Sequence, residues 1–472
     1  MQLYQLTLLA CVLAAAQMGK AQRGRSTLSA QCDASEAGGR LTCPPLVRLS
    51  VSSRCERRGD HHRASRVRLC DRCDTDATAH TTEQTRSNQI CTMAAASSSA
   101  PGPATPAWCT GVTRATPPLL FRARMRTAEL MAASPPVGFH RVRNKDRIWK
   151  LIRSRRSKDP EADKADAAKL LRVARYDSRS MPMDAAAVLT TDTQFTIVPS
   201  VYGYEAPSDP SEFHFWTNFA DKHLFAFYAS DLFAQDEWQC MEIPALCSLR
   251  EWMDAHSKAD GNAAPLTVQG GNPTPVIVMN APREVNIDAV GHKIYGNAFS
   301  VASTETIDAA TTLLPRPVLS HIIAMEALKH RHGAYTSRDI ALTLQTAITA
   351  FKAAVVEASL EFADRKLEGQ GLAPKVVIHT GNWGCGAFGG NVEIMCLLQM
   401  IAARVAGVEN LVYHVLSADN EATCKRAVAA LGLLMDKLRA EAAATPPQQP
   451  NLMEIASYVA GLNYKWGLSN GT

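Results

Sequence analysis

The alternation of apolar and polar positions predicts an α/β domain over residues 186–443. Four short runs rich in β-branched and apolar residues are typical of buried strands: 195–198, 276–279, 376–378 and 411–416. Apolar residues at helical spacing predict helices over five segments: 251–256, 319–330, 340–363, 391–406 and 421–443. Because strands and helices alternate along the chain, the fold class is α/β.

The two ends of the chain differ from this central region. Residues 1–140 are Arg- and Cys-rich, low in complexity around 94–107 and poor in aromatic residues, which predicts a disordered extension. Residues 141–185 begin with a basic run, and 159–176 has helical spacing, so we predict a charged linker helix. A basic surface that attracts an anionic polymer is the alternative. Residues 444–472 form a C-terminal tail whose aromatic side chains could pack back onto the domain.

Charge and targeting signals bear on the partners and the cellular location of the protein. A formal net charge of +5 on 472 residues is mild and argues against a dedicated nucleic-acid binder. Residues 6–16 have the length of a signal-peptide core but lack the positively charged start, and no later segment is predicted to span a membrane. We therefore expect an intracellular protein of the nucleus or cytoplasm, and secretion is the alternative. Cys70 and Cys73 form a lone CxxC, which is weak support for zinc, so we expect no metal and no cofactor.

A glycine-dense loop at 380–390 holds the strongest chemical signal. It follows the predicted strand at 376–378 and precedes the predicted helix at 391–406. Its five glycines allow positive φ and let a ligand touch bare backbone, and the following helix start suits a phosphate. Trp383 and Phe388 add flat faces for a base or a sugar. A tight structural turn is the alternative, and the loop fits neither the P-loop pattern nor the dinucleotide-binding fingerprint.

The string Thr-Gly-Asn-Trp-Gly-Cys-Gly-Ala-Phe-Gly-Gly at 380–390 resembles the C-terminal signature of the poly(ADP-ribose) glycohydrolases. The resemblance covers roughly residues 190–440 and implies a macrodomain, a mixed sheet flanked by helices that binds ADP-ribose. It also directs attention to carboxylates upstream. There the block from Phe219-Ala220 through Gln235-Asp236-Glu237 to Pro244 matches the family's spacing without a gap.

This second match implies roles for the acidic residues. Cleaving a ribose–ribose bond needs a proton for the leaving oxygen and stabilisation of an oxocarbenium-like centre. The resemblance assigns the acid/base role to Glu237 and implies that Asp236 positions the ribose. A solvated surface pair is the alternative for these two acids. Residues 323–328 resemble a family helix.

The sequence departs from the family pattern at three places. Asp221 stands at an asparagine position, Asp236 at a glutamate position, and Phe225-Ala226-Phe227 at a glycine triplet. Two phenylalanines add bulk and remove freedom for positive φ. They could form a different wall of the cleft, or they could fill it.

The resemblance implies one set of substrate-binding residues: Asp221, Gln235, Tyr295, Asn382, Gly384, Cys385, Gly386, Ala387, Phe388 and Gly389. In that set Tyr295 would stack on adenine, Phe388 would lie near the terminal ribose, and the loop glycines would hold the diphosphate. The resemblance thus implies a glycosidase that hydrolyses poly(ADP-ribose) or a related ADP-ribosyl conjugate. A macrodomain that binds ADP-ribose or a nucleotide without cleaving it is the first alternative, and an enzyme acting on another nucleotide-linked substrate is the second. The expected partners are ADP-ribose polymer or ADP-ribosylated protein, with no sequence-specific nucleic acid and no membrane.

Overall fold

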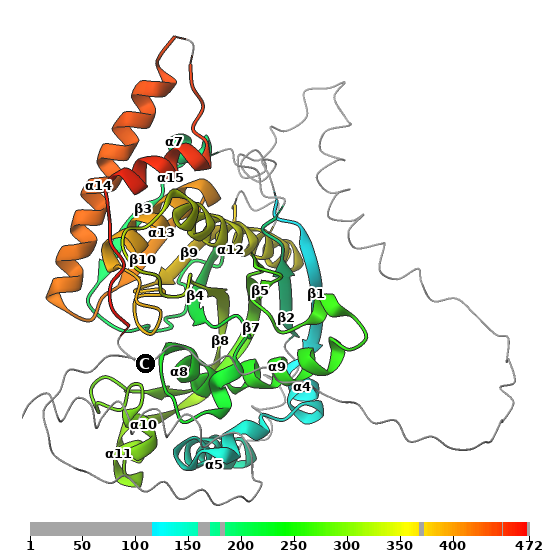
Figure 1. Cartoon of the computed structure of the whole chain (residues 1–472). Coiled ribbons are helices and arrows are strands. Elements are labelled where there is room, and N and C mark those ends of the chain that lie inside the picture. Colours follow the sequence, from blue (N-terminus) through cyan, green and yellow to red (C-terminus); the bar gives the residue numbers. More distant parts are fainter. Residues whose placement is uncertain (1–115, 159–169, 180–184, 368–371, 446, 470–472) are drawn as a thin grey trace, which may run out of the picture. The chain divides into compact units, whose positions relative to one another are not determined.

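An eight-stranded mixed sheet forms the centre of the domain (Figure 1). The computed structural model describes residues 116–158, 170–179, 185–367, 372–445 and 447–469. The strand order is β1-β2-β7-β8-β4-β9-β10-β3. Pairs β1/β2, β2/β7 and β7/β8 are antiparallel, whereas β8, β4, β9, β10 and β3 run parallel to one another. The carboxyl ends of five neighbouring strands therefore meet at one edge of the sheet.

The eight strands have these bounds: β1 Leu119–Arg126, β2 Leu170–Tyr176, β3 Gln194–Val198, β4 Glu212–Ala220, β7 Val276–Ile287, β8 Thr311–Glu326, β9 Lys375–Thr380 and β10 Asn410–His414. A separate two-stranded ribbon pairs β5 Val268–Gln269 with β6 Asn272–Pro273.

Helices cover both faces of the sheet, as Figure 1 shows. One face carries α7 Ala187–Thr190, α12 Ser337–Asp364, α13 Val392–Ala406, α14 Ala418–Ala442 and α15 Leu452–Gly461. The other face carries α4 Thr127–Ala133, α5 Arg143–Lys158, α8 Gln235–Glu242, α9 Pro244–His256, α10 Ala298–Val301 and α11 Thr304–Ala310. Short 3₁₀ turns η1 Val137–Arg141, η2 Ala226–Ala229 and η3 Gly261–Ala263 link them. The α/β class and the helix-flanked mixed sheet are confirmed.

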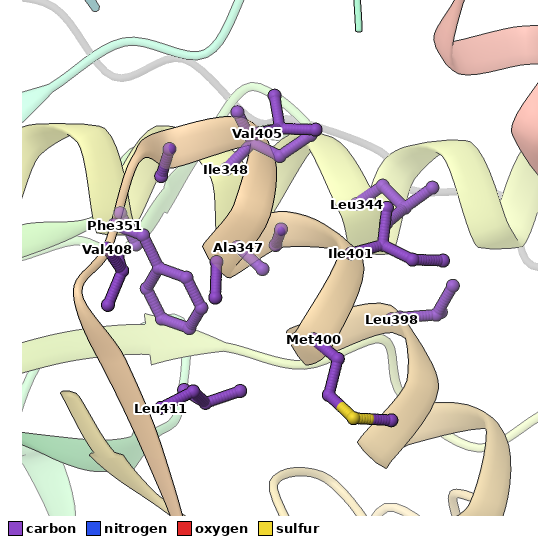
Figure 2. Packing of buried hydrophobic residues seen from close by; sticks show 14 of the residues in the cluster. Leu344, Ala347, Ile348, Phe351, Leu398, Met400, Ile401, Val405, Val408 and Leu411 are labelled. Atoms are coloured by element: carbon purple, nitrogen blue, oxygen red, sulfur yellow. The ribbon is translucent and has the colours of Figure 1, made fainter. Parts of the chain in front are cut away.

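The hydrophobic core on the first face is built mainly between α12 and α13. Figure 2 shows Phe351 of α12 beside Val408 and Leu411, with Leu344 near Ile401 of α13. All five side chains are almost completely buried. This packing fixes the helix that follows the glycine loop and so holds the loop at the edge of the sheet.

Residues 319–330 are not a helix, because β8 extends to Glu326. Its apolar residues alternate between the two cores: Ile323 and Met325 face α12 and α13, while Ile322 and Ala324 face the other helix layer. A strand that is buried on both faces is continuously apolar, so its periodicity does not distinguish it from a helix. The family-like segment 323–328 is therefore the end of a strand and the turn after it.

The domain begins well before residue 186. Strand β2 pairs with β7 through Arg172↔Met279 to Arg175↔Val276, and β1 pairs with β2. Helix α5 is an integral part of the second helix layer, so the predicted linker at 141–185 is wrong over its described residues. Within the segment 159–176, residues 170–176 form a strand and 159–169 lie outside the described residues. The predicted signal core, the low-complexity stretch and the CxxC lie in 1–115, also outside them, whereas 116–140 is ordered into β1, α4 and η1.

We expect a fragment of residues 116–472 to unfold cooperatively in urea and a fragment of residues 186–472 to lack a cooperative transition. The shorter fragment removes β1, β2 and α5, which strips the buried Leu171, Val173 and Ile148 from the core and exposes the edge of β7. Circular dichroism against urea concentration measures the difference. Equal midpoints for the two fragments would show that the N-terminal strands are dispensable.

The other predicted elements agree with the structure. The strands at 195–198, 276–279, 376–378 and 411–416 correspond to β3, β7, β9 and β10, and the helices at 251–256, 340–363, 391–406 and 421–443 correspond to α9, α12, α13 and α14. The C-terminal tail packs back onto the domain, where Trp466 stacks on Tyr335 with ring centroids 4.1 Å apart.

Helix α12 is the one helix among the described residues that is long and apolar enough to cross a membrane. Two thirds of its most apolar window, 67%, is buried inside the domain. That burial is what a core helix of a folded domain requires, because its apolar side chains already have protein partners.

Candidate active site

A cavity of about 770 Å³ lies at the edge of the sheet where the parallel strands end. It is lined by residues that follow β3, β4, β8, β9 and β10, and by the first turn of α8. Open α/β sheets bind ligands outside the carboxyl ends of their strands, and this volume is within the range for small-molecule sites. The cavity is therefore the candidate ligand site.

The glycine loop forms one wall of this cavity. After β9 the chain turns so that Gly384 adopts φ +74°, and the amide of Gly390 donates to the Gly384 carbonyl at 2.8 Å. The backbone amides of Gly386, Ala387 and Phe388 donate to no other described residue, and all three residues line the cavity. A run of free backbone N–H groups forms a concavity that suits an anion such as a phosphate.

Two other residues of the loop have structural partners. Gly389 does not line the cavity; its carbonyl accepts a hydrogen bond from the Gly467 amide of the C-terminal tail at 2.9 Å. Its predicted ligand contact therefore stays a prediction without support from the cavity lining. Trp383 is fully buried and donates from Nε1 to the Met325 carbonyl at 3.1 Å, so it anchors the loop and offers no free ring face. The first amides of α13 are capped by the Asn391 side chain, so free amides occur in the loop and not at the helix start.

The first turn of α8 contributes two acids to the same cavity. Asp236 and Glu237 are both buried and both line the cavity. Glu237 Oε2 accepts a hydrogen bond from the Ala234 amide at 2.9 Å, which is the N-terminal cap of α8. Asp236 Oδ1 accepts from Asn218 Nδ2 at 3.0 Å and from the Cys240 thiol at 3.6 Å. The solvated surface pair considered from sequence is therefore excluded.

Burial makes both carboxyl groups hold their protons more tightly than usual. Burial, together with the charge of Glu237, raises the pKa of Asp236 from 3.8 to about 7, although the hydrogen bonds from Asn218 and Cys240 oppose this. Burial also raises the pKa of Glu237, against the opposing effects of backbone amides and the Lys145 charge. A carboxyl group with a raised pKa can stay protonated near neutral pH and act as a general acid.

This raised pKa predicts how stability depends on pH. The folded protein keeps a proton on Asp236 that the unfolded chain releases, so stability falls as pH rises between about 4 and 7. In Asp236→Asn this fall should shrink, because asparagine carries no proton and keeps the acceptor for Asn218. We expect the difference in unfolding free energy between pH 5 and pH 8 to decrease by about 1 kcal/mol or more, measured by urea denaturation. If Asp236→Asn left this difference unchanged, a group other than Asp236 would cause the loss of stability between pH 5 and pH 8.

Asp221 is neutralised by a lysine that the sequence pattern did not indicate. Its Oδ2 accepts from Lys329 Nζ at 2.9 Å, and Lys329 also pairs with Glu326 at 3.3 Å. Burial alone would raise the pKa of Asp221, but the hydrogen bond and charge of Lys329 lower it below its ordinary value. The Lys329 ammonium also lies 5.3 Å from the centre of the Phe388 ring. The negative charge in place of the family's amide therefore comes with its own cation.

The two phenylalanines at positions 225 and 227 lie in different environments. Phe225 is fully buried in the second core and adopts φ +52°, the left-handed conformation that glycine adopts without strain. Phe227 is 45% exposed and lines the cavity. The phenylalanine side chains therefore do not fill the cleft; one joins the core and the other becomes part of the wall.

Three further predicted ligand residues line the cavity and also have structural partners. Gln235 braces the end of β4, since its Oε1 accepts from the Phe219 amide at 2.7 Å and its Nε2 donates to the Thr217 carbonyl at 3.0 Å. Asn382 Oδ1 accepts from the Tyr413 hydroxyl at 3.2 Å. Cys385 donates weakly to the Trp383 carbonyl, and burial raises the pKa of its thiol.

A pair of backbone hydrogen bonds fixes the segment that carries Tyr295 beside the loop before α8. The amide of its neighbour Gly296 donates to the Phe233 carbonyl at 2.8 Å, and the Phe233 amide donates back to Gly296 at 3.2 Å. The Tyr295 ring lies edge-on to Trp238, with centroids 6.3 Å apart, and is 39% exposed. The same short loop therefore connects Tyr295 with the start of α8.

Sequence reasoning missed three residues that support the acids or the loop before α8. Asn218 lies one position before the family-like Phe219 and carried no separate signal. Lys145 lies more than 80 residues before the loop that it contacts, and Lys329 more than 100 residues after Asp221. No group of three or more metal-ligating side chains occurs among the residues that the structure describes.

A mixed sheet flanked by helices, with a glycine loop and buried carboxylates at its carboxyl edge, is the arrangement of a macrodomain-like fold. Residues 287–423 match the family model of poly(ADP-ribose) glycohydrolase with the macrodomain fold. This segment of the chain is therefore similar to the catalytic domain of the poly(ADP-ribose) glycohydrolases. The matched segment contains Tyr295 and the glycine loop but ends short of α8, so it does not include Asp236 or Glu237.

Solved structures with low overall similarity belong to the same family. The poly(ADP-ribose) glycohydrolase of Thermomonospora curvata is 15% identical, covering 58% of this chain and 99% of its own, with a TM-score of 0.29. The same bacterial protein bound to the inhibitor ADP-HPD gives a TM-score of 0.32. The enzyme of Deinococcus radiodurans in complex with ADP-ribose is 15% identical over 52% of this chain and 90% of its own, with a TM-score of 0.29. No curated protein shows significant similarity to the chain.

Proposed function

We propose that the protein hydrolyses O-glycosidic ribose–ribose bonds of poly(ADP-ribose), or of a related ADP-ribosyl conjugate, and releases ADP-ribose. The observation that carries this proposal is that the buried acids of α8 and the free amides at 386–388 line the same cavity. One wall suits an anionic diphosphate, and the other holds a carboxyl group whose pKa is raised. The family match at 287–423 agrees with this ligand class.

Within this proposal each residue has a distinct task. Glu237 in its protonated form donates a proton to the leaving ribose oxygen and then, as carboxylate, activates the attacking water. Asp236 holds ribose hydroxyls through Oδ2, since both of its hydrogen bonds to described residues use Oδ1. The amides of Gly386, Ala387 and Phe388 bind the diphosphate. Tyr295 offers its half-exposed ring to adenine.

A second candidate function is binding of ADP-ribose without cleavage. The observation that favours it is Phe227, whose exposed ring takes up space in the cavity at a position where the family has glycine. A ring there could hold a ligand in a pose that the acids cannot reach. Release of ADP-ribose from purified polymer by the full chain supports hydrolysis, whereas calorimetric binding of ADP-ribose with no release supports a binding module.

A further inference from the structure

One buried lysine of α5 holds the loop that leads to α8. The Lys145 ammonium donates to the carbonyls of Tyr228 at 3.0 Å, Ser230 at 2.6 Å and Leu232 at 2.9 Å. Its side chain is fully buried. An ammonium has three N–H donors, so all of its donors are used on alternate residues of a single loop.

This loop connects two sets of residues that line the cavity. Phe227 precedes it and Asp236 and Glu237 follow it, so a shift of the loop moves both the ring and the acids. A second contact holds the loop from η1: the Gly138 amide donates to the Tyr228 hydroxyl at 3.1 Å. A Cβ at Gly138 would meet Ala229 Cβ at 2.5 Å, so η1 and the loop are closely packed.

The neighbour of Lys145 extends the same support to the adenine side. Asn144 Nδ2 donates to the carbonyls of Phe299 at 2.7 Å and Ala302 at 3.0 Å, just after Tyr295. Phe299 in turn stacks on Phe233 of the α8 loop, with centroids 3.9 Å apart. Two adjacent residues of α5 thus hold the loop before α8 and the backbone after Tyr295.

The Lys145 charge also acts on that acid. Burial lowers the pKa of Lys145, and the charge of Glu237 opposes this effect. The other titratable groups around the lysine are Asp236, Cys240 and Cys247, while Asp221 and Tyr295 also face Glu237. No described carboxylate forms an ion pair with Lys145, so its charge is balanced by the three carbonyls and these more distant groups.

We propose that Lys145 is a positioning residue for catalysis, which fixes the 228–232 loop and so places Glu237 and Phe227 against the substrate. This inference rests on the proposed hydrolysis at Glu237. Lys145 lies far outside the family match at 287–423, so nothing in that match assigns it a role.

The test compares Lys145→Met and Lys145→Arg in the full chain with Lys150→Met, a change of an exposed lysine on the same helix. A misplaced catalytic group can lower the rate about 10²-fold, so we expect kcat on ADP-ribose polymer to fall by about that factor in both Lys145 variants, with KM changed little. In Lys145→Met the alkaline limb of the pH–rate profile should move to higher pH, because the removed cation no longer lowers the pKa of Glu237. In Lys145→Arg the charge stays and the limb should not move. Lys150→Met should match the wild type.

Wild-type kcat in Lys145→Arg, or an unmoved alkaline limb in a folded Lys145→Met, would overturn the positioning role. If Lys145→Met does not fold, Lys145→Arg alone decides through kcat and KM. If the wild type releases no ADP-ribose, the proposed function has failed. The effect of Lys145 on the loop is then measured as the hydrogen-exchange rate of the backbone amides at 228–237. Faster exchange there in Lys145→Arg than in Lys150→Met would support the positioning role, and equal exchange would overturn it.

Discussion

Glu237→Gln is expected to lower the release of ADP-ribose from polymer by about 10²–10⁴-fold, the usual cost of losing a general acid. Glutamine has nearly the same shape as glutamate, and its amide oxygen can still accept the hydrogen bond from the Ala234 amide that caps α8. The helix should therefore stay in place while the transferable proton is lost. ADP-ribose affinity, measured by calorimetry, should change little because the amides proposed to bind the diphosphate belong to the glycine loop and not to α8.

The matched control for this variant is Glu454→Gln. Glu454 is the third residue of α15 and accepts a hydrogen bond from the Asn451 amide at 3.3 Å, which is the same capping position that Glu237 occupies in α8. It does not line the cavity. We expect wild-type turnover in Glu454→Gln. Full turnover in Glu237→Gln would remove Glu237 from the mechanism.

Gly384→Ala is expected to lower ADP-ribose affinity by a factor of about 10 or more. Gly384 has φ +74°, and a Cβ there would meet the Cβ of Ala327 at 2.4 Å. The left-handed conformation costs an L-residue about 1–2 kcal/mol, and the contact with Ala327, the residue after β8, forces the loop to move. Each 1.4 kcal/mol of lost binding energy corresponds to a tenfold change in Kd. Calorimetry with ADP-ribose measures the effect.

Gly407→Ala separates backbone strain from damage to the loop. Gly407 has nearly the same φ, +76°, but no atom lies within 4 Å of a Cβ placed there, and it ends α13 away from the cavity. This variant should lose stability and keep its ADP-ribose affinity. Equal affinities in the two variants would mean that the loop at 384–388 does not hold the ligand.

The parts of the site that sequence predicts well are local. The glycine loop between β9 and α13 is contiguous, and the spacing from Phe219 to Glu237 lies within one strand, one loop and one helix turn. Periodicity identified α12 and α13 because each has a long apolar face. Periodicity did not identify the strand at 319–326, because a strand buried on both faces loses its alternation of apolar and polar residues.

Other features depend on contacts that no local pattern contains. The Asp221–Lys329 pair joins residues that lie far apart in the chain, so the sequence showed an unexplained charge without its partner. Strands β1 and β2 pair with a sheet whose remaining strands all follow residue 190, so β1 was predicted as part of the extension and β2 as part of the linker helix. Arg172 and Arg122 of these strands pair with Glu357 of α12, which shows how their charge is accommodated inside the domain.

The central claim is that the acids of α8 and the amides of the glycine loop hold one ligand between them. A crystal structure of Glu237→Gln with ADP-ribose bound tests it most directly. The diphosphate is predicted to lie within hydrogen-bonding distance of the Gly386, Ala387 and Phe388 amides, with the terminal ribose against residues 236 and 237. A diphosphate bound elsewhere, or a ribose turned away from the start of α8, would contradict it.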